Sequence, residues 1–269
     1  MTIPSICSRI RTYWLWMAIA LTGAVAFLAF PGAYGAKAHS VLHGLCAQTP
    51  SHTFTFAGNA LPFDGRMTGI YGGTIVTFAW LAIDRRLRFY GNPPRRIIVF
   101  LVACVVAMGL DGFNSLLRDL GLWHPYPPTN VMRLVSGFGT GVALAVILTW
   151  LLASSMWNFS SPKPTVRSFG DLRGVAFGGL AFGAAVLSGW GPFFMPIAAL
   201  LMASAWMTLT VLMLVIVLLL FRIDERVRRL EDLHVPGAVA AALGLAVMLA
   251  LAGGRFWLER VAGIPLSPV

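Results

Sequence analysis

The chain has 269 residues, of which 58% are hydrophobic and only 11% are charged, and its mean hydropathy is +0.78. Because a soluble domain carries about 25% charged residues, this composition excludes an ordinary soluble protein. The net charge of +10 would suit nucleic-acid binding, but the basic residues stand at the ends of apolar runs, so we expect a partner in the lipid bilayer and no nucleic acid.

Seven apolar stretches are long enough to cross a bilayer, and each must then be a helix because lipid offers no hydrogen bonds to the backbone. They are residues 12–32, 62–83, 96–117, 130–156, 171–190, 196–221 and 235–255. The sequence thus predicts an all-α, polytopic, multi-pass helical bundle in the cell (inner) membrane. Residues 1–269 form a single domain in this interpretation, and no soluble domain is expected.

The basic residues also predict the orientation of the bundle. When the predicted helices alternate in direction, most of the 20 Lys and Arg residues fall on the side of the N-terminus. The bias predicts that the N-terminus is inside and the C-terminus outside. The first apolar run also resembles a signal peptide with a weak cleavage site at Ala36-Lys37-Ala38, but its length favours a retained helix.

Glycines spaced four apart form small-residue faces on the fourth and fifth predicted helices. The pairs are Gly137 with Gly141, Gly174 with Gly178, and Gly179 with Gly183. Such pairs let helix backbones approach closely in lipid. We expect these faces to pack within the chain, and contact with other membrane-protein subunits is the alternative. The centres of the predicted helices carry almost no ionisable residues, which argues against proton or cation transport.

Polar residues that bear chemistry concentrate in the two longer predicted outer loops. The first loop holds the candidate metal ligands His43, Cys46, Asp64 and Met67, together with Arg66; the second holds Asp111, Asn130 and Arg133. Because both loops lie outside, their side chains can meet there. No phosphate-binding loop, haem-attachment motif, zinc-protease motif or nucleophile elbow is present, and we assign no catalytic residue.

These loops together resemble DUF2085, a family of uncharacterised bacterial membrane proteins. The resemblance covers roughly residues 39–145. A further part with three predicted helices, roughly residues 165–260, lies outside it. It rests on a His-x-x-Cys-x-Gln element at residues 43–48, on "DGRMTGIYGG" at residues 64–73, on Asp111-Gly112, and on Thr-Asn-x-x-Arg-x-x-x-Gly at residues 129–137. The resemblance implies a membrane location but no established activity.

The chain departs from the family pattern where that pattern has two further cysteines. Asp64 and Met67 stand in their places. A His and three Cys would form a closed zinc site, whereas Met with His and Cys suits copper better. Three interpretations follow: a structural loop with a lost or vestigial metal site, a remodelled zinc or copper site, or a loop docked on another protein. We favour the first, and therefore expect no resident cofactor.

The remaining candidates have a simple structural interpretation. Thr129 or Asn130 can cap the helix that follows. Asp111 and Arg133 fall at similar depths on neighbouring helices, so we expect them to form an ion pair, because a lone charge near lipid is costly. With Arg66 they would complete a structural polar cluster on the outer face.

Three functions are compatible with these features. The first is a non-enzymatic membrane protein, either an accessory or scaffolding subunit of a membrane complex or an orphan helical bundle. The second is a metal-dependent membrane hydrolase, by analogy of fold alone. The third is a carrier of a small apolar or neutral solute. Bare helix centres, glycine faces and the incomplete ligand set favour the first.

Overall fold

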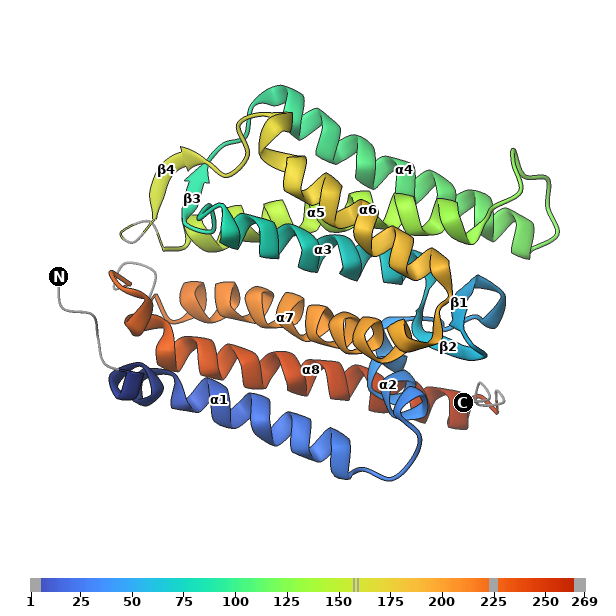
Figure 1. Cartoon of the computed structure of the whole chain (residues 1–269), viewed down its shortest axis with the longest axis horizontal. Coiled ribbons are helices and arrows are strands. Elements are labelled where there is room, and N and C mark those ends of the chain that lie inside the picture. The colour runs from blue at the N-terminus through green and yellow to red at the C-terminus, as the bar shows by residue number, and fades with distance from the viewer. Residues whose placement is uncertain (1–5, 157, 159, 223–226, 264–269) are drawn as a thin grey trace.

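Seven long helices run along the molecule in a computed structural model that describes residues 6–156, 158, 160–222 and 227–263 (Figure 1). They are α1 (Ile6–Ala29), α3 (Gly65–Ile83), α4 (Arg95–Asp119), α5 (Asn130–Ser154), α6 (Arg173–Ser188), α7 (Phe194–Leu220) and α8 (His234–Val261). Each coincides with one predicted span. The helical nature of all seven apolar stretches is therefore confirmed.

Five helical stretches among the described residues are long and apolar enough to cross a membrane, and they contain α4 to α8. The apolar part of α1 that qualifies by composition, Trp14–Ala29, is shorter. Helix α3 has 19 residues and is rich in Gly and Thr, and it is not among the five. A polytopic membrane bundle is thus confirmed, while the count of seven spans and the orientation stay predictions.

Short elements cover one end of the bundle, which we call the hairpin end. Helix α2 (Tyr34–Leu42) and the 3-10 turns at His43–Leu45 and Pro50–His52 precede an antiparallel hairpin of β1 (Thr53–Phe56) and β2 (Asn59–Asp64). The hairpin turns at Ala57 and Gly58, both with positive φ, as a two-residue hairpin loop requires.

Helix α3 begins at Gly65, three residues later than predicted, because residues 62–64 belong to strand β2. The Asp64 side chain accepts the backbone N–H of Met67 at 2.8 Å and so caps the helix. The start of the second predicted span was therefore wrong, since an apolar strand segment was taken as the first turn of the helix.

The opposite end of the bundle is closed by a parallel pair of short strands, β3 (Phe89–Gly91) and β4 (Ser161–Pro164). Arg86, which follows α3, pairs with Asp84 and with Asp171, the latter at 2.8 Å. Trp80 Nε1 donates to the Asp171 carbonyl. Further 3-10 turns precede α6 (Phe169–Leu172), α7 (Gly191–Phe193) and α8 (Leu230–Leu233).

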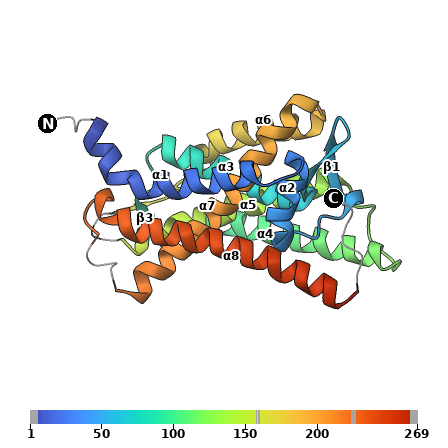
Figure 2. The same ribbon diagram turned by 90° about the horizontal axis from the view of Figure 1, so that it is seen from below.

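The helices form two groups along the long axis. Figure 1 shows α3, α4, α5 and α6 on one side and α7, α8 and α1 on the other. Helix α3 contacts α5, α6 and α7, so it lies at the centre of the bundle although it is less apolar than its neighbours. Helix α1 lies along α8, as the two views agree (Figures 1 and 2).

Helices α3 and α5 meet backbone to backbone. A Cβ atom at Gly69 or Gly73 would overlap the backbone of Leu134 or Phe138, and one at Gly137 would overlap the carbonyl oxygen of Arg66. Gly141 lies in the same way against Ile70. The glycines of both helices are therefore needed for this close contact.

The glycine face of α6 also packs within the chain. Gly174 lies against Trp80, Gly178 against Val76 and Gly179 against Phe138, whereas nothing lies within 4 Å of a Cβ placed on Gly183. The prediction of packing within the chain is confirmed for these glycines. With the exception of Gly183, these faces are occupied and do not offer a contact to another subunit.

The surfaces that point away from the bundle are apolar. Helix α4 exposes a row of large hydrophobic side chains, namely Ile98, Val99, Phe100, Val102, Val105, Val106, Leu110 and Phe113. An exposed apolar area of this kind marks contact with lipid or protein. Together with the length of the helices, it supports contact with a lipid bilayer.

We expect Gly137→Ala to destabilise the bundle by about 1–3 kcal/mol, because its methyl group would overlap a backbone oxygen that cannot move aside. Gly183→Ala is the matched control: its methyl group enters open space, and alanine favours a helix by about 1 kcal/mol over glycine. Thermal unfolding in detergent measures both variants. Equal unfolding midpoints would contradict the close contact of α3 with α5.

Candidate functional site

The predicted site residues come together at the hairpin end in two neighbouring groups. The first, the loop cluster, joins residues after α2 to the last turns of α8; it contains His43, Cys46, Gln48, Arg255 and Glu259. The second, the arginine cluster, joins the first turns of α3 and α5 to α4; it contains Arg66, Asp111, Asn114, Ser115, Asn130 and Arg133. The two loops that the sequence places on one side of the bundle thus contact one another.

His43 is the centre of the loop cluster, and both of its ring nitrogens are hydrogen bonded. Nδ1 lies 2.9 Å from Gln48 Oε1, and Nε2 lies 2.7 Å from Glu259 Oε2. The ring is buried and stacks on Phe256. Because neither nitrogen is free, His43 has no position left for a substrate proton or a metal ion in this arrangement.

Arg255 holds the loop that carries these residues. Its Nε donates to Glu259 Oε1 at 2.8 Å, and its Nη1 donates to the carbonyl oxygens of His43, at 2.7 Å, and of Cys46. Gln48 has a φ of +55°, which is strained for a residue with a side chain. Its amide nitrogen donates to the carbonyls of His39 and Pro62, and these bonds hold the strained turn.

Cys46 is a buried thiol beside the start of α3. Its Sγ accepts the backbone N–H groups of Gln48 at 3.3 Å and of Asp64 at 3.4 Å. Burial, with a smaller effect of the Asp64 charge, raises the pKa of the Cys46 thiol to about 12. The thiol is therefore protonated at neutral pH and is neither a nucleophile nor a ready metal ligand.

The four candidate metal ligands consequently serve separate contacts. His43 turns towards Glu259, Cys46 receives N–H groups, and Asp64 caps α3 through the N–H of Met67. Over the described part of the chain, no three His, Cys, Asp or Glu side chains lie close enough together to hold a metal ion. The residues present do not fit zinc or copper in this geometry, and the vestigial interpretation remains our proposal.

In the arginine cluster, Arg66 pairs with Asp111 on α4. Arg66 Nη2 lies 2.9 Å from Asp111 Oδ2, and Tyr126 donates its hydroxyl to Oδ1 at 3.2 Å. The guanidinium group passes close to Gly112, where a Cβ atom would lie 3.8 Å from the Arg66 Cζ atom. Asp111 therefore supplies the carboxylate for Arg66, and Gly112, which has no side chain, leaves space for the guanidinium group.

Arg133 is almost fully buried, with 3% of its surface exposed, and has different partners. Its Nη1 donates to Asn130 Oδ1 at 2.8 Å and its Nη2 to Ser115 Oγ at 2.6 Å. The expected pair of Asp111 with Arg133 was therefore wrong. Arg66 occupies the carboxylate, and Arg133 reaches Ser115, one helical turn further along α4.

Asn130 was also predicted as a capping residue. The cap of α5 is Thr129, whose hydroxyl accepts the N–H of Met132 at 3.3 Å. Asn130 instead accepts from Arg133 and donates to the carbonyl of Ser51. It links the start of α5 to the loop before the hairpin.

The arginine cluster brings two guanidinium groups to one face of α4, where Asp111 receives Arg66 and Ser115 receives Arg133. The Nε atoms of Arg66 and Arg133 and the Oδ1 atom of Asn114 are buried without a protein partner. Burying unpaired polar atoms costs free energy, so this cluster depends on the packing around it. His52 lies at its edge, 3.6 Å from Asp119, and burial together with the charge of Arg133 lowers the pKa of His52.

A cavity of about 530 Å³ with both polar and apolar walls adjoins the loop cluster. Its lining includes His39, His43, Gln48 and Asn59, with Phe194 and Phe256 as apolar walls. His39 Nε2 contacts the carbonyl of Ala60 at 3.3 Å, and burial lowers the pKa of His39. The cavity thus carries a few polar groups on mainly apolar walls, and its histidines and its neighbouring thiol hydrogen bond within the loop.

Sequence reasoning missed the contribution of α8 to this site. Arg255 and Glu259 stand four residues apart near the end of the last span, a spacing that predicts an ion pair on one helix face. The contact of this pair with residues more than 200 positions earlier follows from the tertiary fold and has no local signal. Gly69 and Gly73 of α3 belong to the family-like motif, and their four-residue spacing also indicates a packing face.

Comparison with known proteins agrees with the resemblance expected from the loops. Residues 46–147 match the family described as predicted membrane protein (DUF2085). An uncharacterised protein of the archaeon Methanothermobacter thermautotrophicus is 28% identical over 105 residues, which cover 38% of this chain and 83% of that protein. No solved structure matches the chain. The similarity therefore includes the arginine cluster and leaves α6 to α8 outside.

The ion pair can be tested by a double-mutant cycle on unfolding in detergent. Arg66→Ala should destabilise the bundle by about 3–5 kcal/mol, because it leaves the buried Asp111 charge without its partner, and Asp111→Ala should cost less, because Arg66 is partly exposed. The double variant should recover part of the loss. The coupling of Asp111 with Arg66 should exceed its coupling with Arg133, and the reverse order would overturn this assignment.

The vestigial metal site can be tested by restoring the family cysteines. We expect the purified protein to hold no stoichiometric zinc, and the double variant Asp64→Cys with Met67→Cys to gain it, because a thiol at position 64 would lie beside Cys46. The serine double variant at the same positions is the control. Elemental analysis that finds one zinc per natural chain, lost in Cys46→Ser, would disprove the proposal.

Proposed function

We propose that this chain is a non-enzymatic integral membrane protein of the cell (inner) membrane that serves as an accessory or scaffolding subunit of a membrane complex. The observation that carries the proposal is the state of His43: both ring nitrogens are bonded, to Gln48 and to Glu259, and the ring is stacked on Phe256. His43, the residue best suited to acid–base chemistry, thus serves to hold the loop cluster together.

The other polar residues of the hairpin end support the same proposal. Cys46 has a protonated, buried thiol, Asp64 caps a helix, and Asp111 neutralises Arg66. Cys46 and Asp111 make contacts between segments that are distant in sequence, and Asp64 fixes the start of α3. Such a network fixes the shape of one end of the bundle and presents it as a rigid surface.

A metal-dependent hydrolase receives less support. It requires a metal ion or an activated nucleophile with a free general base near it. The loop cluster offers a histidine with no free nitrogen and a thiol with a raised pKa. Transport of a small apolar or neutral solute remains the alternative function, and the polar contacts of the loop cluster neither favour nor oppose it.

We also propose that the hairpin end faces outward. Helix α1 begins at the opposite end of the bundle from the one where α8 ends (Figure 1). This arrangement supports termini on opposite sides of the membrane, and the distribution of basic residues predicts that the N-terminus is the one inside. The scaffold surface would then be the outer one.

The test is co-purification of a C-terminally tagged chain from its native membranes after mild cross-linking. The tag should first prove accessible to protease added outside intact cells. We then expect one or a few membrane proteins in stoichiometric amounts. Arg255→Ala should reduce their recovery, because it releases the loop that carries His43 and Cys46.

Lys163→Gln is the control, since Lys163 lies on β4 at the opposite end of the bundle. Recovery of the chain without a stoichiometric protein partner would contradict the scaffold proposal. A protected tag would contradict the orientation. Hydrolysis of a lipid or peptide substrate that disappears in His43→Gln, with the fold retained, would favour an enzyme instead.

A further inference from the structure

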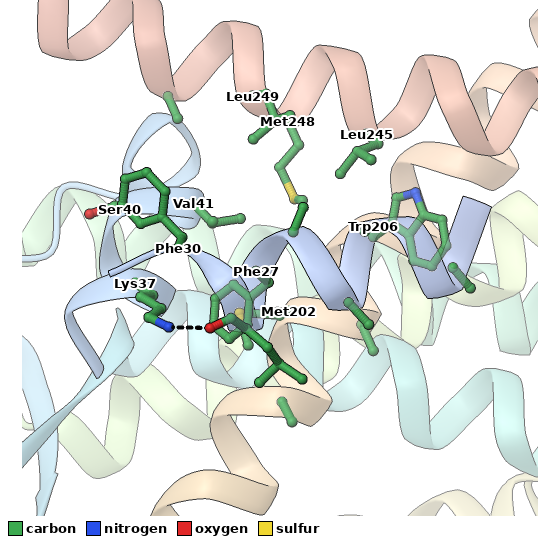
Figure 3. A pocket seen from close by; sticks show the side chains of 18 of the residues that line it. Phe27, Phe30, Lys37, Ser40, Val41, Met202, Trp206, Leu245, Met248 and Leu249 are labelled. Atoms are coloured by element: carbon green, nitrogen blue, oxygen red, sulfur yellow. Dashed lines mark hydrogen bonds between the residues drawn. The ribbon is translucent and has the colours of Figure 1, made fainter. Parts of the chain in front are cut away.

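An apolar cavity of about 680 Å³ lies between α1, α7 and α8, with α2 across one of its ends (Figure 3). This volume falls within the range of small-molecule sites, about 300–1,000 Å³. Its walls come from Phe27 on α1, Met202 and Trp206 on α7, and Leu245 and Met248 on α8. The cavity opens to the surface, since Leu28 and Leu249 in its lining are exposed.

The cavity is polar only at its α2 end. Tyr34, Lys37 and Val41 line it from one face of α2, in keeping with the spacing of a helix face. Among the described lining residues, Lys37 is the one charged side chain, and the lining contains no acidic residue. Deeper in, the Trp206 N–H is already bonded to the carbonyl of Ala241.

The start of α2 lies near the same end of the cavity, where Tyr34 lines it, whereas Ala33, Gly35 and Ala36 line the cavity beside the loop cluster. Its first helical bond runs from the Lys37 N–H to the Ala33 carbonyl, so the N–H groups of residues 34–36 have no partner inside the helix. Ala33 provides no side-chain cap. The positive end of the helix dipole at this start adds to the charge of Lys37.

Lys37 lies one turn into the same helix. Its Nζ donates to the Leu28 carbonyl at 3.0 Å and lies 5.8 Å from the centre of the Phe27 ring. Figure 3 shows this bond at the edge of the cavity, beside Phe27 and Phe30. An ammonium group has three donors, and one of them makes this bond, so two donors remain for a phosphate oxygen.

From this juxtaposition we propose that the cavity binds an anionic phospholipid of the bilayer. One acyl chain lies between α1, α7 and α8, and the phosphate group lies at the α2 end of the cavity next to Lys37. The lipid ties α1 to the rest of the bundle, because the cavity separates much of α1 from α7. This site is separate from the loop cluster and does not depend on the scaffold function.

The test is native mass spectrometry of the full chain released from nanodiscs of dioleoyl-phosphatidylglycerol and dioleoyl-phosphatidylcholine in equal amounts. The two lipids share their acyl chains, so the apolar contribution is matched. We expect one retained lipid per chain and a preference for phosphatidylglycerol of about fivefold, the effect of one lysine near an anionic headgroup.

Two variants separate the headgroup contact from the acyl-chain contact. Lys37→Gln should abolish the preference while one lipid is still retained. Lys163→Gln, which changes the other lysine of the chain, should leave the preference intact. Ala203→Phe, in the α7 wall of the cavity, should reduce retention of both lipids equally.

Equal retention of the two lipids by the natural chain would overturn the proposal, as would an unchanged preference in Lys37→Gln. A dimer without retained lipid would show instead that a second copy covers the cavity. If Ala203→Phe lowers the unfolding midpoint, Ala24→Phe serves as the cavity-filling variant in its place, since Ala24 lines the cavity from α1. Unchanged lipid retention in the folded filling variant would also overturn the proposal.

Discussion

The close contact of α3 with α5 is the constraint on which the hairpin end depends. Glycines on both helices remove the side chains that would separate the two backbones, so that the carbonyl of Arg66 packs against Gly137. Packing between helices in lipid gains little from the hydrophobic effect and depends on such close approach. Helix α3, less apolar than the helices around it, is thereby held at the centre of the bundle.

This contact also places the charges. Arg66 lies in the first turn of α3 and Arg133 in the first turn of α5, so joining the two helix starts brings two guanidinium groups to one face of α4. Asp111 and Ser115, one turn apart on α4, receive one group each. Because the charged residues neutralise and hydrogen bond one another away from the helix centres, the bundle keeps an apolar surface towards lipid and a polar end.

The sequence predicted the helices better than it predicted their contacts. All seven apolar stretches are helical, because length and hydropathy are local properties, and the two outer loops do meet. The partner of Asp111 was wrong, because Arg66 and Arg133 have the same charge and only packing decides between them. The contact of Arg255 and Glu259 with His43 was missed for the same reason: residues 43 and 259 become neighbours only after α8 packs against the loop.

Amide hydrogen exchange of the purified protein in detergent tests the central claim most directly, because it reports the opening of each helix separately. If α3 is held by its backbone contact with α5, the amides of residues 70–81 should exchange as slowly as those of α5 and far more slowly than those of α1. Exchange of α3 as fast as that of α1, with α5 still protected, would contradict the claim.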